Sequence, residues 1–129
     1  MKKITIFSIQ PAGLNREKFH VARRYRGLLA GLPLLLPAEH GRGRHVWHQF
    51  TVRSEKRDAI RAALDETGIA SMIYYPVPLH RQPLYAADSA GLELPVTDQA
   101  ARSVLSLPIF AHLGEERLHR VCEAVRSCS

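Results

Sequence analysis

Apolar residues recur at steps of three and four along much of the chain, a spacing typical of helices with one buried face. The longest such stripe begins after Asn15, a residue type favoured at helix N-caps, and stops at Gly31 and Pro33. A shorter stripe follows Ser54, which can cap a helix in the same way, and ends at Gly68. The pattern therefore predicts helices over residues 15–29, 55–67, 95–104 and 115–126.

Alternating apolar and polar residues indicate strands between these helices. The clearest alternation covers residues 46–53, where Val46, His48, Phe50 and Val52 share one face. Weaker or shorter strand patterns occupy residues 4–9, 34–36, 69–75 and 105–108. We therefore expect an α+β fold of two layers. Its small sheet has three or four strands, mixed or antiparallel, and the helices pack on one face.

Length and composition place the chain among small globular domains. Its 129 residues suit one domain, and 46% hydrophobic with 23% charged residues is ordinary usage for a folded protein. A disordered chain, a fibrous protein and a two-domain cofactor enzyme are thereby disfavoured. The net charge of +6 suits a nucleic-acid, phosphate or membrane-surface partner, but it equally suits a coding bias toward arginine.

Cysteine usage and the apolar runs bear on the compartment. Cys122 and Cys128 form no disulfide framework, so we expect a reducing cytoplasm, with Cys122 as a small core residue of the last helix. The run over residues 4–9 is shorter than the apolar core of a secretory signal. A membrane span needs about 20 apolar residues, so we expect no span.

Recognisable motifs of catalysis and metal binding are absent from the sequence. His45 and His48 lie three apart on a predicted strand, so they point to opposite faces and cannot share a metal ion. No nucleophile elbow, P-loop or G-x-G-x-x-G motif is present. The Gly-Arg-Gly-Arg stretch at residues 41–44 can be interpreted as a phosphate grip or as a mobile loop. We therefore predict no catalytic residue and no metal site in this chain.

Residues 74–85 concentrate aromatic and polar groups on a backbone stiffened by prolines. The stretch reads Tyr-Tyr-Pro-Val-Pro-Leu-His-Arg-Gln-Pro-Leu-Tyr. Ligand sites are often built on rigid loops of this kind, so we interpret the segment as contacting a ligand. The alternative is a proline-rich crossing on the surface.

The order of several motifs resembles that of a known family. These motifs are His45-Val46-Trp47-His48-Gln49-Phe50, Arg57-Asp58, Gly68-Ile69, Tyr75-Pro76-Val77-Pro78-Leu79-His80-Arg81-Gln82-Pro83, Leu94-Pro95-Val96 and Leu105-Ser106-Leu107-Pro108. Together with the helix over residues 15–29, they resemble the C-terminal domain of the DegT/DnrJ/StrS family of nucleotide-sugar aminotransferases. The resemblance runs from Asn15 to Arg126. We therefore expect an unmatched leader over residues 1–14 and one small-domain-like domain over residues 15–129.

The resemblance implies a fold and a chemistry that this chain holds only in part. The fold would be the C-terminal domain of the aspartate aminotransferase fold (fold type I). Family members use pyridoxal phosphate to move an amino group, commonly from glutamate, onto a nucleotide-linked keto sugar, and they are usually dimers. The Schiff-base lysine and the acid at the pyridinium nitrogen belong to a large N-terminal domain without a counterpart here. We do not expect Lys2, Lys3, Lys18 or Lys56 to replace that lysine.

The expected function is therefore that of a C-terminal aminotransferase fragment, inactive alone, whose partner is the missing large domain or a second copy. In the family, the segment matching residues 75–82 reaches the substrate pocket. The resemblance thus implies substrate contacts from Tyr75, His80 and Gln82. It also suggests contacts from Tyr74, where the family usually has histidine, and from Arg81, at a variable position that could meet the phosphates of the sugar nucleotide.

Two other functions stay open on the sequence. A stand-alone binding or regulatory module for an anionic ligand or nucleic acid would suit the charge of +6. No helix-turn-helix pattern is evident, however, which disfavours nucleic acid. A structural remnant would expose apolar surface that normally packs against the large domain, so we expect self-association or limited solubility.

Overall fold

The computed structural model describes residues 12–39, 41, 43 and 45–128. The predicted strand over residues 4–9 lies outside this part of the chain. The described elements are the helices α1 (Ala12–Leu28), α2 (Arg57–Glu66), α3 (Pro95–Ser103) and α4 (Glu115–Ser127), the strands β1 (Phe50–Arg53) and β2 (Val104–Leu107), and the 3₁₀ turns η1 (Leu79–Arg81) and η2 (Pro83–Tyr85). Helices combined with an antiparallel sheet confirm the α+β class.

The sheet is smaller than the sequence predicts. β1 and β2 pair antiparallel, with Phe50 opposite Leu107 and Arg53 opposite Val104. The other two predicted strands are reduced to single antiparallel bridges on the outer edges of this pair. The bridges join Leu35 to Arg53 and Met72 to Ser106. The prediction of three or four strands is therefore wrong for the described residues, although four segments do lie side by side. The prolines at 33 and 37, which flank the first of these segments, shorten its pairing because proline cannot donate to a ladder.

The predicted strand over residues 46–53 is correct only in its second half. Trp47 has a φ of 51°, which interrupts the extended backbone three residues before β1. Its indole is only 2% exposed and lies 5.7 Å from the ring of Phe50, while Val46 is exposed. Burying the large indole thus reverses the inside and outside positions expected from the alternation. Phe50 and Val52 are buried, as predicted.

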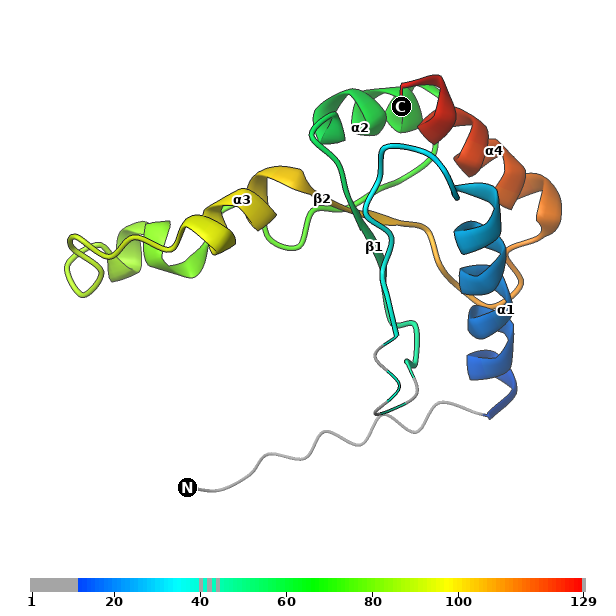
Figure 1. Cartoon of the computed structure of the whole chain (residues 1–129), viewed down its shortest axis with the longest axis horizontal. Helices are drawn as coiled ribbons and strands as arrows, with labels where there is room; N and C mark the ends of the chain where they lie inside the picture. The colour runs from blue at the N-terminus through cyan, green and yellow to red at the C-terminus, as the bar shows by residue number, and fades with distance from the viewer. Residues whose placement is uncertain (1–11, 40, 42, 44, 129) are drawn as a thin grey trace.

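One hydrophobic core joins the sheet to three helices. Figure 1 shows α1 and α4 side by side, with α2 close to the C-terminal part of α4. The largest fully buried side chains come from these elements and from the residues next to them: Trp47, Tyr25, Leu29, Phe50, Val52, Ile60, Leu64, Leu105, Leu118, Cys122 and Val125. The hydroxyl of Tyr25 donates to the carbonyl of Pro108 at 2.8 Å, so α1 is also tied to the segment after β2. Cys122 is a core residue, as predicted.

The helix boundaries agree with the sequence to within one residue except at the N-termini of α1 and α2. α1 begins at Ala12, so the prediction of Asn15 as its N-cap is wrong. The prediction of Ser54 as a cap is also wrong, because α2 begins at Arg57 with Lys56 as its N-cap. Ser54 instead stabilises the turn before the helix, where its Oγ accepts a hydrogen bond from the amide of Lys56 at 3.1 Å. Gly68 has a φ of 72°, the left-handed conformation that glycine adopts most easily after a helix. α3 and α4 begin at the predicted Pro95 and Glu115.

Residues 74–103 form an arm that projects from the opposite side of the sheet to α1, and it comprises η1, η2 and α3 (Figure 1). The arm is anchored by Arg57, whose side chain is 11% exposed. Its Nη1 donates to the carbonyls of Ala101 and Val104, each at 3.2 Å. Most of the exposed large apolar residues of the described chain lie on this arm: Tyr74, Tyr75, Val77, Leu79, Leu84, Tyr85, Leu92, Leu94 and Val96.

Candidate functional site

The arm encloses a groove that brings together three of the five predicted site residues. We call it the arm groove, and its volume is about 370 Å³. It is lined by Tyr74, Tyr75, Val77, Pro78, Leu79, Gln82, Thr97, Ala100, Ala101 and Val104. One wall of the groove is the segment over residues 74–82, which Pro76 and Pro78 exclude from helix and sheet. The helix α3 supplies the other wall. The two phenols and the Gln82 amide are the groups suited to bind a polar ligand there.

The other two predicted residues, His80 and Arg81, meet the carboxylate of Asp98 instead of lining the groove. Arg81 Nη2 donates to Asp98 Oδ2 at 2.7 Å, and its Nε donates to Oδ1 at 3.3 Å. His80 Nε2 lies 3.3 Å from Asp98 Oδ1, but the two groups are not aligned as a hydrogen bond. The His80 side chain is 6% exposed, so it offers little surface to a ligand in this conformation.

The contact with Arg81 determines the charge state of Asp98. The hydrogen bond from Arg81 lowers the pKa of Asp98, and the charges of Arg81 and His80 act in the same direction, while burial opposes them. The same hydrogen bond raises the pKa of Arg81. Asp98 is therefore ionised at neutral pH and accepts from both donors of the arginine fork. This geometry holds η1 against the first turn of α3.

Sequence reasoning missed two residues that shape this region, Asp98 and Arg57. Asp98 is in the first turn of α3, where an acidic residue is explained by the helix dipole alone. Its partner Arg81 is 17 residues away, a distance in sequence that no periodic pattern reports. Arg57 belongs to a motif used for the resemblance, but its contact with the start of β2 spans more than 40 residues.

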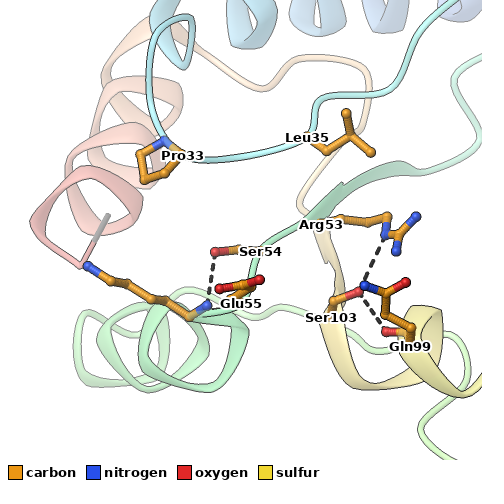
Figure 2. A pocket seen from close by; sticks show the side chains of 8 residues that line it. Pro33, Leu35, Arg53, Ser54, Glu55, Gln99 and Ser103 are labelled. Carbon is orange, nitrogen blue, oxygen red and sulfur yellow. Dashed lines mark hydrogen bonds between the residues drawn. The ribbon is translucent and has the colours of Figure 1, made fainter.

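A second groove lies at the outer edge of β1, beside the bridge formed by Leu35, and has a volume of about 440 Å³. Figure 2 shows two hydrogen bonds that join Arg53, Ser103 and Gln99 on one side of this groove. Arg53 Nε donates to Ser103 Oγ at 3.4 Å, and Ser103 Oγ donates to the carbonyl of Gln99 at 2.8 Å. Arg53 and Ser103 are thus engaged in contacts within the domain, and none of the predicted site residues lines this groove.

The described residues offer neither a metal site nor a membrane-spanning helix, and the arm groove has no anchor for pyridoxal phosphate. Within the described chain, no group of three or more His, Cys, Asp or Glu residues could hold a metal ion. No described helix is both long and apolar enough to span a bilayer. The described lysines, Lys18 and Lys56, do not line the arm groove, so the groove does not fit the Schiff-base anchor of pyridoxal phosphate. The Gly-Arg-Gly-Arg stretch lies partly outside the described residues.

Comparison with known proteins decides the family. The sequence profile of the DegT/DnrJ/EryC1/StrS aminotransferase family matches residues 12–126. The chain belongs to this family. Its members depend on pyridoxal phosphate and act on nucleotide sugars. The resemblance found in the sequence motifs is thereby confirmed.

Individual family members match the chain closely but extend well beyond it. UDP-N-acetyl-3-dehydro-alpha-D-glucosamine 3-aminotransferase of Acidithiobacillus ferrooxidans is 42% identical over 115 residues, which are 89% of this chain and 31% of that protein. The crystal structure of DesV from S. venezuelae, solved with a ketimine intermediate, aligns with a TM-score of 0.83 at 43% identity and covers 88% of this chain and 31% of the other.

A further solved structure of the family contains a form of the cofactor. NtdA of Bacillus subtilis, with bound PMP, aligns with a TM-score of 0.79 at 31% identity, covering 89% of this chain and 28% of that chain. The chain thus spans about a third of the length of the relatives that it matches.

Proposed function

We propose that this chain is the C-terminal, small-domain part of a pyridoxal-phosphate-dependent aminotransferase that acts in the cytoplasm. The complete enzyme would move an amino group from an amino acid such as glutamate to a keto sugar attached to a nucleotide. The observation that carries the proposal is the family match over residues 12–126, combined with coverage of only 31% of the Acidithiobacillus relative. The remaining share of the enzyme would come from a large domain on another polypeptide or another part of the same one.

In this proposal the arm supplies the substrate side of the active site. Tyr74, Tyr75 and Gln82 would contact the sugar nucleotide, because their side chains line the arm groove. His80 and Arg81 would act through Asp98 by holding that segment in place. The exposed apolar residues of the arm would pack against the large domain.

The cofactor would be held by the large domain, since the arm groove has no lysine for a Schiff base. When bound, pyridoxal phosphate supplies the electron sink that amino transfer requires. The residues of this chain would then bind and orient the sugar, and the apolar walls of the groove would exclude water from it. The isolated chain would have no transaminase activity.

A chimeric enzyme tests the proposal. Residues 12–126 of this chain replace the matching share of the Acidithiobacillus enzyme, and amino transfer to that enzyme's sugar nucleotide is measured. We expect an active chimera and an inactive isolated chain. Within the chimera, Gln82→Ala should lower kcat/KM about tenfold, because it removes hydrogen bonds made to the substrate. Gln99→Ala is the matched control, since Gln99 lies on α3 but lines the other groove. A folded chimera without activity, or equal kinetics in the two variants, would contradict the assignment.

The net charge of +6 favours a second candidate function, a stand-alone binding or regulatory module for an anionic ligand or nucleic acid. Binding through phosphate contacts weakens steeply as salt rises. A titration of the chain with duplex DNA at two salt concentrations therefore tests the nucleic-acid form of this function. Absence of binding at low salt would exclude it.

A further inference from the structure

A third groove lies on the body of the domain, and the proposed substrate site does not use it. We call it the α4 groove; its volume is about 490 Å³, within the usual size of small-molecule sites. Its walls come from the turn after α2, from the segment after β2 and from α4. The lining residues are Gly68, Ile69, Ala70, Pro108, Phe110, Leu113, Arg117, Arg120 and Val121.

The inner part of the α4 groove is apolar. Leu113 and Val121 are core residues, exposed by 8% and 2%, and they close its base. Phe110 also lines the groove and is 42% exposed, so its ring is accessible to a ligand. Binding an apolar group of a ligand would remove this ring from water, and the gain in free energy scales with the apolar area covered.

Among the described residues, two guanidinium groups are the only charged groups that line the groove. Arg117 and Arg120 lie three residues apart on α4, so they share a face of the helix. Arg120 Nη2 donates to the carbonyl of Thr67 at 3.3 Å, which holds its guanidinium beside the end of α2. No lining residue carries a carboxylate, and neither arginine forms an ion pair with a described acidic residue. The two like charges are therefore not neutralised within the groove.

We propose that the α4 groove binds a small amphipathic carboxylate, whose apolar chain or ring lies against Phe110, Leu113 and Val121. Its carboxylate accepts hydrogen bonds from Arg117 and from the free donors of Arg120, because a guanidinium fork matches a carboxylate. A sugar nucleotide does not fit this groove, since its many hydroxyls would find no polar side chains other than the two arginines. The site is thus separate from the arm groove and does not depend on the proposed aminotransfer.

Dodecanoate, titrated below its micelle concentration into the ¹⁵N-labelled full chain, is the probe for this site. We expect saturable amide shifts at Ala70, Phe110, Leu113 and Arg117. Dodecanol has the same chain without the charge, so it should bind about tenfold more weakly. Arg117→Gln should weaken dodecanoate binding about tenfold and leave dodecanol unchanged. Phe110→Ala should weaken both ligands, because it removes a shared apolar contact.

Arg61→Gln is the matched control, because Arg61 is an exposed arginine of α2 that does not line the groove. The ¹⁵N spectrum of each variant also reports whether the fold is intact. Arg117 has an exposed side chain, so its replacement should leave that spectrum unchanged away from the site. Three results would overturn the proposal: shifts confined to the arm, equal affinity for dodecanoate and dodecanol, or equal affinity in Arg117→Gln and Arg61→Gln.

Discussion

Arg81 Nη2 and Asp98 Oδ2 lie 2.7 Å apart and join the two walls of the arm. Arg81 belongs to η1 and Asp98 to α3, so this ion pair links the two elements. Gln82, the residue after Arg81, lines that groove. The ion pair therefore links the position of Gln82, a candidate substrate contact, to Asp98, whose carboxylate does not line the groove.

Replacing this carboxylate should loosen the arm. In Asp98→Asn the charge that holds Arg81 is lost, and we expect amide exchange over residues 79–85 to become several-fold faster while α4 is unaffected. Hydrogen exchange followed by mass spectrometry measures both segments in one sample. Asp88→Asn is the control, since Asp88 is an exposed residue of the same arm. Unchanged exchange in Asp98→Asn would mean that packing alone holds η1.

The hydrogen bond from Tyr25 to Pro108 should contribute measurably to stability. Tyr25 is fully buried, and burial raises the pKa of its phenol well above the ordinary value, so the hydroxyl stays protonated and donates. Tyr25→Phe keeps the ring but leaves the Pro108 carbonyl without this donor, at a cost of about 1–2 kcal/mol in the free energy of unfolding. Urea denaturation measures the change. Tyr75→Phe, at an exposed position, should leave the midpoint where it is.

The contact between α1 and the start of α4 should weaken in acid. Arg24 donates to Glu115 through Nε at 3.0 Å and through Nη2 at 2.8 Å. These hydrogen bonds lower the pKa of Glu115 below its ordinary value of 4.5, with further contributions from His20 and His119, while burial opposes them. A lowered pKa in the folded state stabilises the fold above pH 4.5, and this contribution is lost as the pH falls through the folded pKa.

The pH prediction is tested with Glu115→Gln. Its urea midpoint should lie below that of the unmodified chain at pH 6 and should converge with it as the pH falls through the lowered pKa of Glu115. Glu116→Gln is the control, because Glu116 is an exposed neighbour with no ion pair to a described residue. A difference in urea midpoint that stays constant as the pH is lowered would assign the effect to packing instead of charge.

The apolar surface of the arm should make the isolated chain self-associate. Leu84 is 80% exposed and lies among the other exposed apolar residues of the arm. We expect Leu84→Ser to shift the sedimentation profile toward monomer, because it removes apolar area that copies bury against one another. Val46→Ser is the control at an exposed apolar position outside the arm. If the unmodified chain is a monomer at high concentration, the arm does not mediate association.

Much of the fold could be predicted from local patterns. The stripes of α2, α3 and α4 and the buried side of β1 follow from residue spacing, because a helix or strand repeats its faces at a fixed period. The series of motifs between residues 15 and 126 indicated the family, and the family profile matches residues 12–126. The segment over residues 74–85, part of which lines the arm groove, stood out because aromatic and polar side chains gather there on a backbone stiffened by prolines.

What the sequence by itself determined was therefore the type and order of the elements and the family. Only the tertiary structure decided that Trp47 lies inside and Val46 outside, and that two of the expected strands shrink to single bridges. It also decided that His80 and Arg81 turn toward Asp98 while Gln82 lines the groove. The physical reason is that these outcomes depend on contacts between residues far apart in the chain, and periodicity reports only which face of its own element a residue occupies.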